Sequence, residues 1–552
     1  MSTLRCGLTS AIIVLGSLML CSYTTVQNAG AELPVSQFRI AGTVVSIIGG
    51  SALARARVTI RNAKDPKDIQ SLLTGDDGHF EFHVKADKYG LQGAKRGFIT
   101  ADYEQHEQFS TAIVTGAGFD TEDILLKLAP SAVLGGRILD ESGDPVRHVN
   151  VALWREDHSM GVSHIVRFRN DVTDDQGVYE FTPLDGGTYF LSVSATTPWY
   201  AVHPASITQE GVAPTPSVLD RALDVVYPTT YYAGATESED ATPIPIRGGD
   251  RIELDLHLVP VPALHVIFRG QQNDENMYPM PVLQQRVFDG IDFQHSQENI
   301  QMISPGVFEM ATAPGKYAVR LSGPTQNSRI SEVDISQDRQ EVDTSSGEAL
   351  SNSAASVHVL GEESVPSELF VVLRDGQGRG VDFQRVSNQG GVEFDNVAAG
   401  TYDLIAGSPN SAYSIVRITS QGHETSGHTL KVPAGSSLSL SLSMVGGTTR
   451  VDGYVKHAGK AIAGAMVVLI PKHPEANREL FRRDQSDLDG SFSLPRVIPG
   501  PYTVVAIADG WDLDWSKTAV ISKYAGRGQT IVVPGQESHS IQLPDSVEVQ
   551  PK

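Results

Sequence analysis

Two pairs of residues in this 552-residue chain have a spacing that could hold a zinc ion. His295 and Glu298 form a His-x-x-Glu pattern, which binds zinc when one helix presents both side chains and a further ligand completes the site. His79 and His83 share one face of an expected strand, but no third ligand accompanies them. Short β segments surround the first pair. We interpret His295 with Glu298 as a chance match and expect His79 and His83 to face solvent.

An acidic turn near the C-terminal end has part of the spacing of a calcium loop. Asp487, Asp489 and Gly490 stand at suitable offsets, but Gln485 and Arg496 occupy the first and twelfth positions. A calcium loop needs an acidic residue and a bidentate glutamate there. We interpret the segment as a hairpin turn in which an aspartate carboxylate caps the backbone. The sequence therefore predicts no metal ion and no cofactor.

Motifs of nucleophilic or nucleotide chemistry are missing from the sequence. It contains no Gly-x-Ser-x-Gly, no phosphate-binding loop and no dinucleotide fingerprint. Its two cysteines, Cys6 and Cys21, precede residue 31, which leaves no thiol for disulfides or catalysis beyond that point. We predict that the protein is not an enzyme. A hydrolase site assembled across loops of an atypical middle domain stays open as an alternative.

Clustered aromatic residues are the remaining candidates for ligand binding. Their flat apolar faces could stack on sugar rings or on peptide prolines while polar atoms stay hydrated. Alternatively, the same rings could close the interface between two neighbouring domains. One group lies in a Pro- and Thr-rich insertion and the other in a loop near residue 513: Trp199, Tyr200, Tyr231 and Tyr232, and then Trp511 and Trp515.

Three expected strands, whose apolar residues fall at the same relative positions, must position these residues. In each copy a glycine precedes apolar residues at alternating positions, which is typical of a strand with one buried face. An acidic turn that ends in glycine follows about twenty residues later, and an aromatic residue then begins the next strand. The three copies begin at Gly50, Gly143 and Gly459, and their turns end at Gly78, Gly177 and Gly490.

A tyrosine after a second turn recurs five times. In Greek-key sandwiches such a tyrosine returns its hydroxyl to the backbone across a corner, so we predict architectural roles for all five. Their spacing of 85 to 128 residues matches the size of a small sandwich domain. They are Tyr89, Tyr189, Tyr317, Tyr402 and Tyr502.

The Gly-x-Pro-Val strand, the Thr-Asp-x-x-Gly-x-Tyr hairpin and the Gly-x-Tyr-x-Leu strand together resemble the carboxypeptidase regulatory-like domain family. The resemblance covers 38–128, 131–195 and 449–508, is fair over 390–406 and is poor over 260–347. It implies a transthyretin-like Greek-key β-sandwich fold. The same fold group includes starch-binding-like and collagen-adhesin B-type modules, so the resemblance also implies glycan or surface binding.

The predicted fold is all-β, with about five tandem sandwiches after a signal peptide. Arg5, an apolar run and Ala29-Gly30-Ala31 have the features of an export signal. Lipid attachment at Cys21 is an alternative that Leu20 disfavours. The ranges are 1–31 for the signal, 38–130, 131–260 with the aromatic insertion, 261–347 (atypical), 348–446 (eroded) and 447–545.

The net charge of the chain limits the classes of partner that it could bind. The net charge of −22 repels nucleic acid, and no apolar run after the signal is long enough to span a membrane. We expect an exported protein of the periplasm, the outer surface or the medium that acts as a binding, adhesion or spacer array. Its expected partner is a polysaccharide or a cell-surface protein, and carbohydrate binding through the aromatic loops is the main alternative to a purely structural role.

Overall fold

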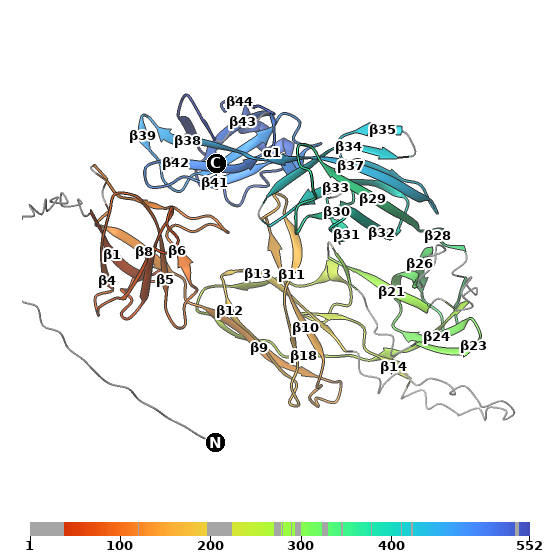
Figure 1. Cartoon of the computed structure of the whole chain (residues 1–552). Helices are drawn as coiled ribbons and strands as arrows, with labels where there is room; N and C mark the ends of the chain where they lie inside the picture. The colour runs from red at the N-terminus through yellow and green to blue at the C-terminus, as the bar shows by residue number, and fades with distance from the viewer. Residues whose placement is uncertain are drawn as a thin grey trace, which may run out of the picture.

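The computed structural model describes residues 38–552, except 117, 120, 196–223, 270–277, 279, 289, 293–299, 323–328, 344, 345, 377, 410, 421, 422 and 536–539. Within that part the fold is almost entirely β, with one α-helix, α1 (Thr518–Ala525). The described residues include no helix that is long and apolar enough to cross a membrane. The predicted all-β, multi-domain fold is confirmed (Figure 1).

The first two modules each pack two sheets face to face around an apolar core. The first contains β1 (Phe38–Ser46), β2 (Arg57–Asn62), β3 (Ile69–Leu73), β4 (His79–Val84), β5 (Lys88–Ala94), β6 (Ala101–Asp102), β7 (Ile113–Val114) and β8 (Ile124–Leu128). The second contains β9 (Ala132–Leu139), β10 (Asn150–Asp157), β11 (His164–Val172), β12 (Val178–Leu184), β13 (Gly187–Ser194), β14 (Val225–Val226), β15 (Thr230–Tyr231), β16 (Ile244–Ile246), β17 (Arg251–Glu253) and β18 (Leu256–His257).

The third and fourth modules have their own cores although their opening sequence pattern is lost. The third contains β19 (Val261–Pro262), β20 (Leu264–Arg269), β21 (Met280–Val287), β22 (Gly290–Asp292), β23 (Ile300–Ser304), β24 (Val307–Thr312), β25 (Gly315–Ser322), β26 (Arg329–Ile335), β27 (Glu341–Asp343) and β28 (Glu348–Ala349). The fourth contains β29 (Ser351–Val359), β30 (Phe370–Arg374), β31 (Gly380–Arg385), β32 (Gly391–Val397), β33 (Gly400–Gly407), β34 (Ala412–Ser420), β35 (His423–Ser426), β36 (Thr429–Val432) and β37 (Ser437–Gly447).

The fifth module adds α1 to the outer face of its sandwich. Its strands are β38 (Thr449–His457), β39 (Lys460–Ala461), β40 (Met466–Pro471), β41 (Arg482–Gln485), β42 (Ser491–Val497), β43 (Gly500–Ile507), β44 (Gln529–Val533), β45 (Ser540–Gln542) and β46 (Val547–Gln550). Two observed ends differ from the expected ranges. Strand β28 pairs with β26 of the third module, and β46 begins at Val547, beyond residue 545.

All five modules have the same strand pairing. A leading strand, such as β1, lies antiparallel to the strand that follows the turn glycine and parallel to a strand near the end of the module. A second long strand, such as β2, lies between two antiparallel neighbours in the other half of the sandwich. Strands β20 and β29 repeat the first of these arrangements in the third and fourth modules. The topology therefore persists where the opening Gly-x-Pro-Val pattern does not, because alternating burial is enough to specify each sheet face.

The glycine that ends each acidic turn is required by close packing. Gly78, Gly177 and Gly490 have φ between +72° and +79°, and a Cβ at these positions would meet the carbonyl oxygen of the module's first strand at 2.8 Å or less. A buried hydroxyl just before the turn, such as Thr74, accepts a hydrogen bond from the backbone where the second strand approaches. Sequence spacing placed these turns correctly because they are local. The expected hairpins are wrong, however, because the strands on either side of a turn, such as β3 and β4 or β41 and β42, pair with other strands and not with each other.

Each predicted architectural tyrosine is buried and donates its hydroxyl to the carbonyl oxygen four residues earlier. The O···O distances run from 2.7 to 3.3 Å, and the exposed fractions lie between 1 and 7%. The hydroxyl satisfies a carbonyl at the corner before the strand, while the ring fills the core. The prediction for these five residues is confirmed.

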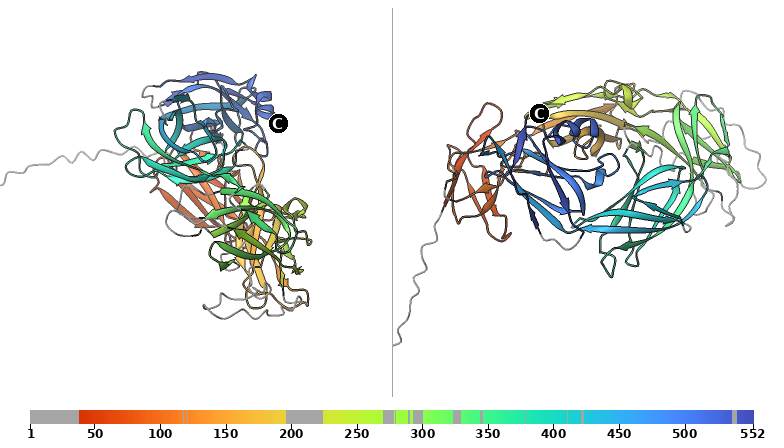
Figure 2. Two further views of the ribbon diagram at one scale, coloured as in Figure 1. Left: turned by 90° about the vertical axis from the view of Figure 1, so that its right-hand side faces the viewer. Right: turned by 90° about the horizontal axis from the view of Figure 1, so that it is seen from above.

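The modules do not form an extended string. The fifth module lies beside the first and between it and the fourth, as two directions of view show (Figures 1 and 2). Hydrogen bonds join residues far apart in sequence, including Arg483 to Glu107 and Ser163 to Asp514. The chain therefore curls back on itself, and its last module contacts the first two.

Candidate ligand-binding cleft

Arg483 on β41 joins three modules. Its guanidinium donates two hydrogen bonds to the Glu107 carboxylate of the first module, with N···O distances of 3.2 and 2.7 Å. It also donates to the Ser159 carbonyl of the second module and lies 4.2 Å from the centre of the Trp515 ring. A buried arginine with two matched hydrogen bonds is among the stronger charged contacts, so Arg483 fixes the relative position of these modules.

Neighbouring side chains extend the contact between the first and fifth modules. Gln485 donates to the Glu104 carbonyl at 2.6 Å and to Thr111 at 2.8 Å. Asp487 accepts from the backbone N–H of Ala112 at 2.9 Å and from the Lys88 ammonium at 2.7 Å. The backbone N–H of Ser491 in its own turn is capped by Asp489 instead. Asp487 thus serves mainly an inter-module contact, and Asp489 provides the aspartate cap expected from sequence.

The two residue pairs whose spacing could suit a metal ion have different outcomes. His79 and His83 are exposed, as expected, and both lie within 4.0 Å of Glu81. His295 and Glu298 fall outside the described residues. Among the residues that the structure describes, no group of three His, Cys, Asp or Glu side chains could hold a metal ion.

The two tryptophans of the fifth module lie at module contacts. The Trp511 ring stacks on His106 with ring centres 4.9 Å apart and an interplanar angle of 5°, and it also contacts Phe109. Trp515 is 7% exposed and packs against Phe481. Trp515 is buried at this contact and Trp511 is half-buried. Both positions favour the interface role that is the alternative to ligand binding for these aromatic residues.

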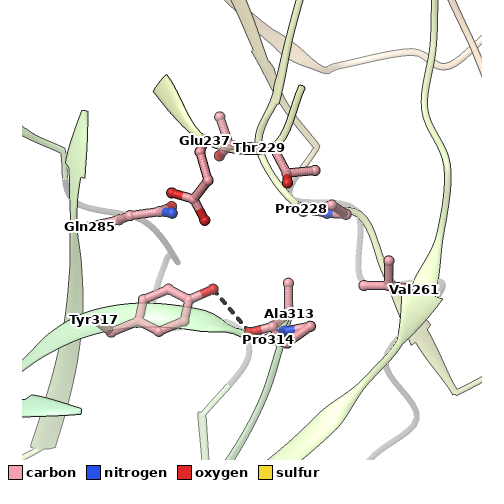
Figure 3. A pocket seen from close by; sticks show the side chains of 9 residues that line it. Pro228, Thr229, Glu237, Val261, Gln285, Ala313, Pro314 and Tyr317 are labelled. Atoms are coloured by element: carbon pink, nitrogen blue, oxygen red, sulfur yellow. Dashed lines mark hydrogen bonds between the residues drawn. The ribbon is translucent and has the colours of Figure 1, made fainter. Parts of the chain in front are cut away.

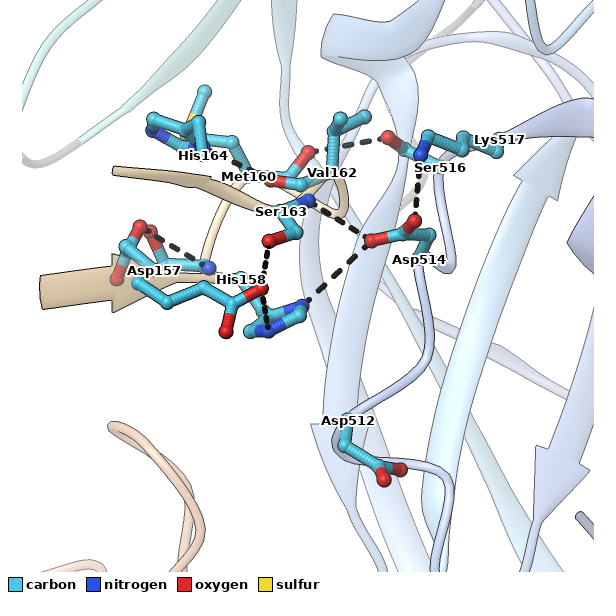
Figure 4. Close-up of polar contacts among 12 residues, drawn as sticks. Asp157, His158, Met160, Val162, Ser163, His164, Asp512, Asp514, Ser516 and Lys517 are labelled. Atoms are coloured by element: carbon cyan, nitrogen blue, oxygen red, sulfur yellow. Dashed lines mark hydrogen bonds and ion pairs between the residues drawn. The ribbon is translucent and has the colours of Figure 1, made fainter. Parts of the chain in front are cut away.

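A hairpin tip of the second module docks on the Trp515 loop (Figure 4). We call residues 157–164, between β10 and β11, the latch hairpin. Its Ser163 N–H donates to Asp514 at 2.9 Å, and the Ser516 N–H donates to the Gly161 carbonyl at 3.1 Å. His158 lies 3.6 Å from Asp514. Gly161 has φ +76°, and a Cβ there would lie 2.7 Å from the Trp515 ring.

Aromatic residues also fill the contact between the second and third modules. Tyr231 is 1% exposed and meets Phe288 edge to face at 5.6 Å, while Trp154 contacts the same ring at 5.3 Å. Tyr232 is half-buried against the second core. Buried rings cannot present a flat face to a sugar, so Tyr231 does not meet the exposure that carbohydrate binding requires. Trp199 and Tyr200 lie outside the described residues.

A small pocket lies beside this contact (Figure 3). Its volume is about 80 Å³, and Thr229, Glu237, Gln285 and Tyr317 are among the residues that line it. Binding pockets for small molecules usually have volumes of several hundred cubic ångströms. This pocket has room for water-sized groups only.

A much larger open cleft of about 1490 Å³ lies where the modules meet. Its lining comes from all five modules, including Phe109 of the first, Val287 of the third and Tyr413 of the fourth. Seven arginines line it, against two carboxylates and no lysine, although the whole chain carries a net charge of −22. The arginines are Arg167, Arg374, Arg379, Arg478, Arg482, Arg483 and Arg496.

Arg379 and Arg483 pair with the carboxylates of Asp375 and Glu107, whereas several of the other arginines have no ion pair with a described carboxylate. The guanidinium groups of Arg374 and Arg478 make no hydrogen bond or ion pair with the described residues. Arg482 donates to the backbone carbonyls of Glu479, Phe481 and Arg496. Burial lowers the pKa of Arg374, and neighbouring Arg478 lowers it further, while Glu479 and Asp403 raise it.

The two carboxyl groups in the cleft only partly offset this charge. Burial raises the pKa of Asp484 to about 7, although it accepts a backbone hydrogen bond from Ser493 at 2.6 Å. Burial likewise raises the pKa of Glu479, against the opposing effect of His428. The side chain of Glu479 is 6% exposed, and its Oε2 has no hydrogen-bond partner among the described residues. Both groups hold protons more readily than surface carboxylates do.

Ser414, His428 and Glu479 lie together but do not form a catalytic triad. The Ser414 hydroxyl donates to Glu479 Oε1 at 3.3 Å, and His428 Nδ1 lies 3.7 Å from the same oxygen. The carboxylate therefore lies between the hydroxyl and the imidazole. In a triad the imidazole lies between them and takes the hydroxyl proton. This cluster instead connects the fourth and fifth modules.

Comparisons with known proteins do not place the chain in a family. Neither protein-family models nor curated proteins match it. Solved structures with some likeness include the Bacillus anthracis TIE protein, with 10% identity over 74% of each chain and a TM-score of 0.17. A streptococcal ancillary pilin covers 52% of this chain and 100% of its own, with 8% identity and a TM-score of 0.20. The shaft pilin SpaA from Lactobacillus rhamnosus GG covers 41% and 98%, with 12% identity and a TM-score of 0.19.

Sequence reasoning missed the arginines of the cleft. They lie on several different strands and loops, and the chain segments that carry them are separated by up to several hundred residues. The only local signal was Arg482 beside Arg483 in β41, which is unremarkable in a strand near the surface. The resemblance to the carboxypeptidase regulatory-like domain did not indicate the cleft, because its motifs specify the module and not the contact between modules.

Proposed function

We propose that this chain is a non-catalytic, exported protein of the cell envelope whose five modules form a binding platform, with the arginine-lined cleft as the ligand site. One observation carries the proposal: the fifth module contacts the first and second, and the resulting cleft has a lining from all five. Such a site exists only in the assembled chain.

The same observation supports a binding platform over a spacer. A spacer gains length with each added module, whereas here the last module returns to the first (Figure 2). Buried contacts at Arg483, Gln485 and Asp487 hold this return in place. The arrangement therefore favours a ligand-binding role over the role of an extended spacer. A binding site needs lining residues that are held in fixed positions, and the buried polar contacts between the modules hold them.

Co-sedimentation with cell-envelope fractions tests the proposal. We expect the purified mature chain to sediment with envelope polysaccharide or protein, and we expect the Gly161→Ala variant, which disturbs the latch hairpin, to bind more weakly. Gly143→Ala is the matched control, since Gly143 also has a positive φ but a Cβ added there would have no atom within 4 Å. A folded chain that binds no envelope fraction would remove the proposal.

The aromatic insertion supplies a separate arm of that experiment. Trp199 and Tyr200 remain predicted carbohydrate-binding residues outside the described part of the chain. Loss of binding in Trp199→Ala, with binding unchanged in Gly161→Ala, would place the ligand site on the insertion and not in the cleft.

A further inference from the structure

The ligand of the cleft can be characterised from its charge. Among the residues that line it, every basic side chain other than His164 is an arginine. The planar guanidinium forms paired hydrogen bonds with carboxylate, sulfate or phosphate groups, which a lysine ammonium does not. A positive cleft in a chain of net charge −22 also concentrates anions locally against the overall repulsion.

Several guanidinium groups are available to such a ligand. Arg374 is half-buried and Arg478 is exposed, and neither pairs with a described carboxylate. Arg496 uses one nitrogen to donate to the Pro409 carbonyl at 3.2 Å. Placing like charges side by side is unfavourable by itself and becomes favourable when an anion lies between them.

The cleft is too large for one small anion. Its volume of about 1490 Å³ exceeds the range of ordinary small-molecule pockets, so a ligand of several units is needed to fill it. Apolar groups such as Ile405, Pro409 and Tyr413 also line the cleft. A lining that combines apolar and cationic groups suits a chain of rings that carry acidic substituents.

Edge strands at the cleft argue against an extended peptide. Strands β11, β31 and β41 are the outer strands of their sheets and contribute to the lining. Arginine side chains, including Arg167 on β11 and Arg482 on β41, lie along two of these edges. Charged side chains on an edge oppose the addition of another strand, so recognition through backbone pairing is disfavoured.

We infer that the cleft binds a segment of an acidic polysaccharide, whose carboxylate or sulfate groups pair with Arg374, Arg478 and Arg496. This inference rests on the proposed binding function and specifies the ligand of the same site. Neutral glycans lack the groups that these arginines recognise and are expected to bind weakly.

Isothermal titration calorimetry with oligogalacturonate, sulfated dextran, neutral dextran and poly-L-glutamate tests the inference on the full mature chain. We expect the acidic saccharides to bind, with affinity that falls as NaCl is raised. The double variant Arg374→Gln with Arg478→Gln should lower that affinity by about a hundredfold or more, because it removes two charged hydrogen bonds, each worth about 1.5–3 kcal/mol. The two acidic saccharides differ in their charged group and thus distinguish carboxylate from sulfate recognition.

The matched control is the double variant Arg417→Gln with Arg450→Gln. It removes the same charge from exposed ion pairs outside the cleft lining. Its affinity should stay within about twofold of the wild type, since distant surface charges are screened. Circular dichroism and thermal melting check that both variants fold.

Three results would overturn the inference. Equal binding of neutral and acidic dextrans would remove the charge argument while leaving the envelope-binding proposal intact. Unchanged affinity in the Arg374 and Arg478 variant would move the site elsewhere. Tighter binding of poly-L-glutamate than of either acidic saccharide would assign the cleft to acidic peptides. If envelope co-sedimentation also fails, the proposed function fails as well.

Discussion

Single residues in the acidic turns are fixed by close backbone contact. A Cβ at Gly490 would lie 2.5 Å from the Val455 carbonyl oxygen, and the residue has φ +79°. Gly459 in the same module has φ +81° but no atom within 4 Å of that position. The two glycines therefore separate the effect of crowding from the effect of a left-handed backbone.

We predict that Gly490→Ala destabilises the fifth module by at least about 1 kcal/mol more than Gly459→Ala does. Both variants place alanine in the left-handed region at a cost of about 1–2 kcal/mol. Only the first also forces two backbones apart, which typically adds about 1–3 kcal/mol. Chemical denaturation followed by the fluorescence of the fifth module measures the difference. Equal destabilisation would show that the close approach relaxes without cost.

A buried histidine links the second and third modules. His265 on β20 lies 2.9 Å from Asp224 and 3.2 Å from Glu309, and it is 5% exposed. Glu309 chiefly raises the pKa of His265, with help from Asp224 and against burial, to about 9. The charged imidazolium is therefore the favoured form at neutral pH.

The pH dependence of this contact follows from the raised pKa. The folded value exceeds the unfolded value of about 6.5, so the stabilisation is complete below pH 6.5 and is lost as pH rises through about 9. We predict that His265→Gln lowers the melting temperature at pH 6 and has a smaller effect at pH 10. The exposed His83→Gln serves as control. If His265→Gln lowered the melting temperature by the same amount at pH 6 and pH 10, the ion-pair assignment would be contradicted.

At the scale of elements, the latch hairpin shows how one turn residue fixes a contact between distant strands. Gly161 allows the hairpin tip to approach Trp515 and Ser516, and its carbonyl accepts from the Ser516 N–H. A side chain at this position would overlap the Trp515 ring.

We predict that Gly161→Ala releases the latch hairpin while both modules stay folded. Hydrogen exchange should increase in 157–164 and in 511–517, with little change in the second core. Gly143→Ala, in a turn of the same module with open space around it, should leave both segments protected. Unchanged exchange in Gly161→Ala would mean that the loop shifts to accept the methyl group.

At the scale of the whole molecule, the return of the fifth module to the first depends on few charged contacts. Arg483 is 4% exposed at its side chain, and its partner Glu107 is 23% exposed. Removing one member of such a pair leaves the other charge poorly compensated, and loss of a buried partner typically costs about 3–5 kcal/mol.

We predict that Arg483→Met separates the first module from the fifth and increases the radius of gyration measured by small-angle X-ray scattering. Arg450→Met, which removes an exposed ion pair with Asp452 in the same module, should leave the scattering curve unchanged. An unaltered curve for Arg483→Met would show that Gln485, Asp487 and the aromatic contacts suffice to hold the modules together.

Sequence alone determined the nature of the module. Alternating apolar residues, turn glycines and the corner tyrosines act over a few residues, so they predicted the all-β fold and the roles of Tyr89, Tyr189, Tyr317, Tyr402 and Tyr502 correctly. The same local reasoning placed the acidic turns, because turn chemistry depends on the residues within a turn, but it did not show that the two strands that each turn joins pair with other strands.

Only the tertiary structure decided how the modules sit together and which residues line the cleft. Arg483 and Glu107 are 376 positions apart, and neither has a local feature that marks it for the other. Tyr231, Trp511 and Trp515 were visible in the sequence, but whether their rings face solvent or a neighbouring module depends on that packing. Strand period and turn chemistry encode a module's inner face, whereas contacts between modules involve outer faces that no periodic pattern constrains.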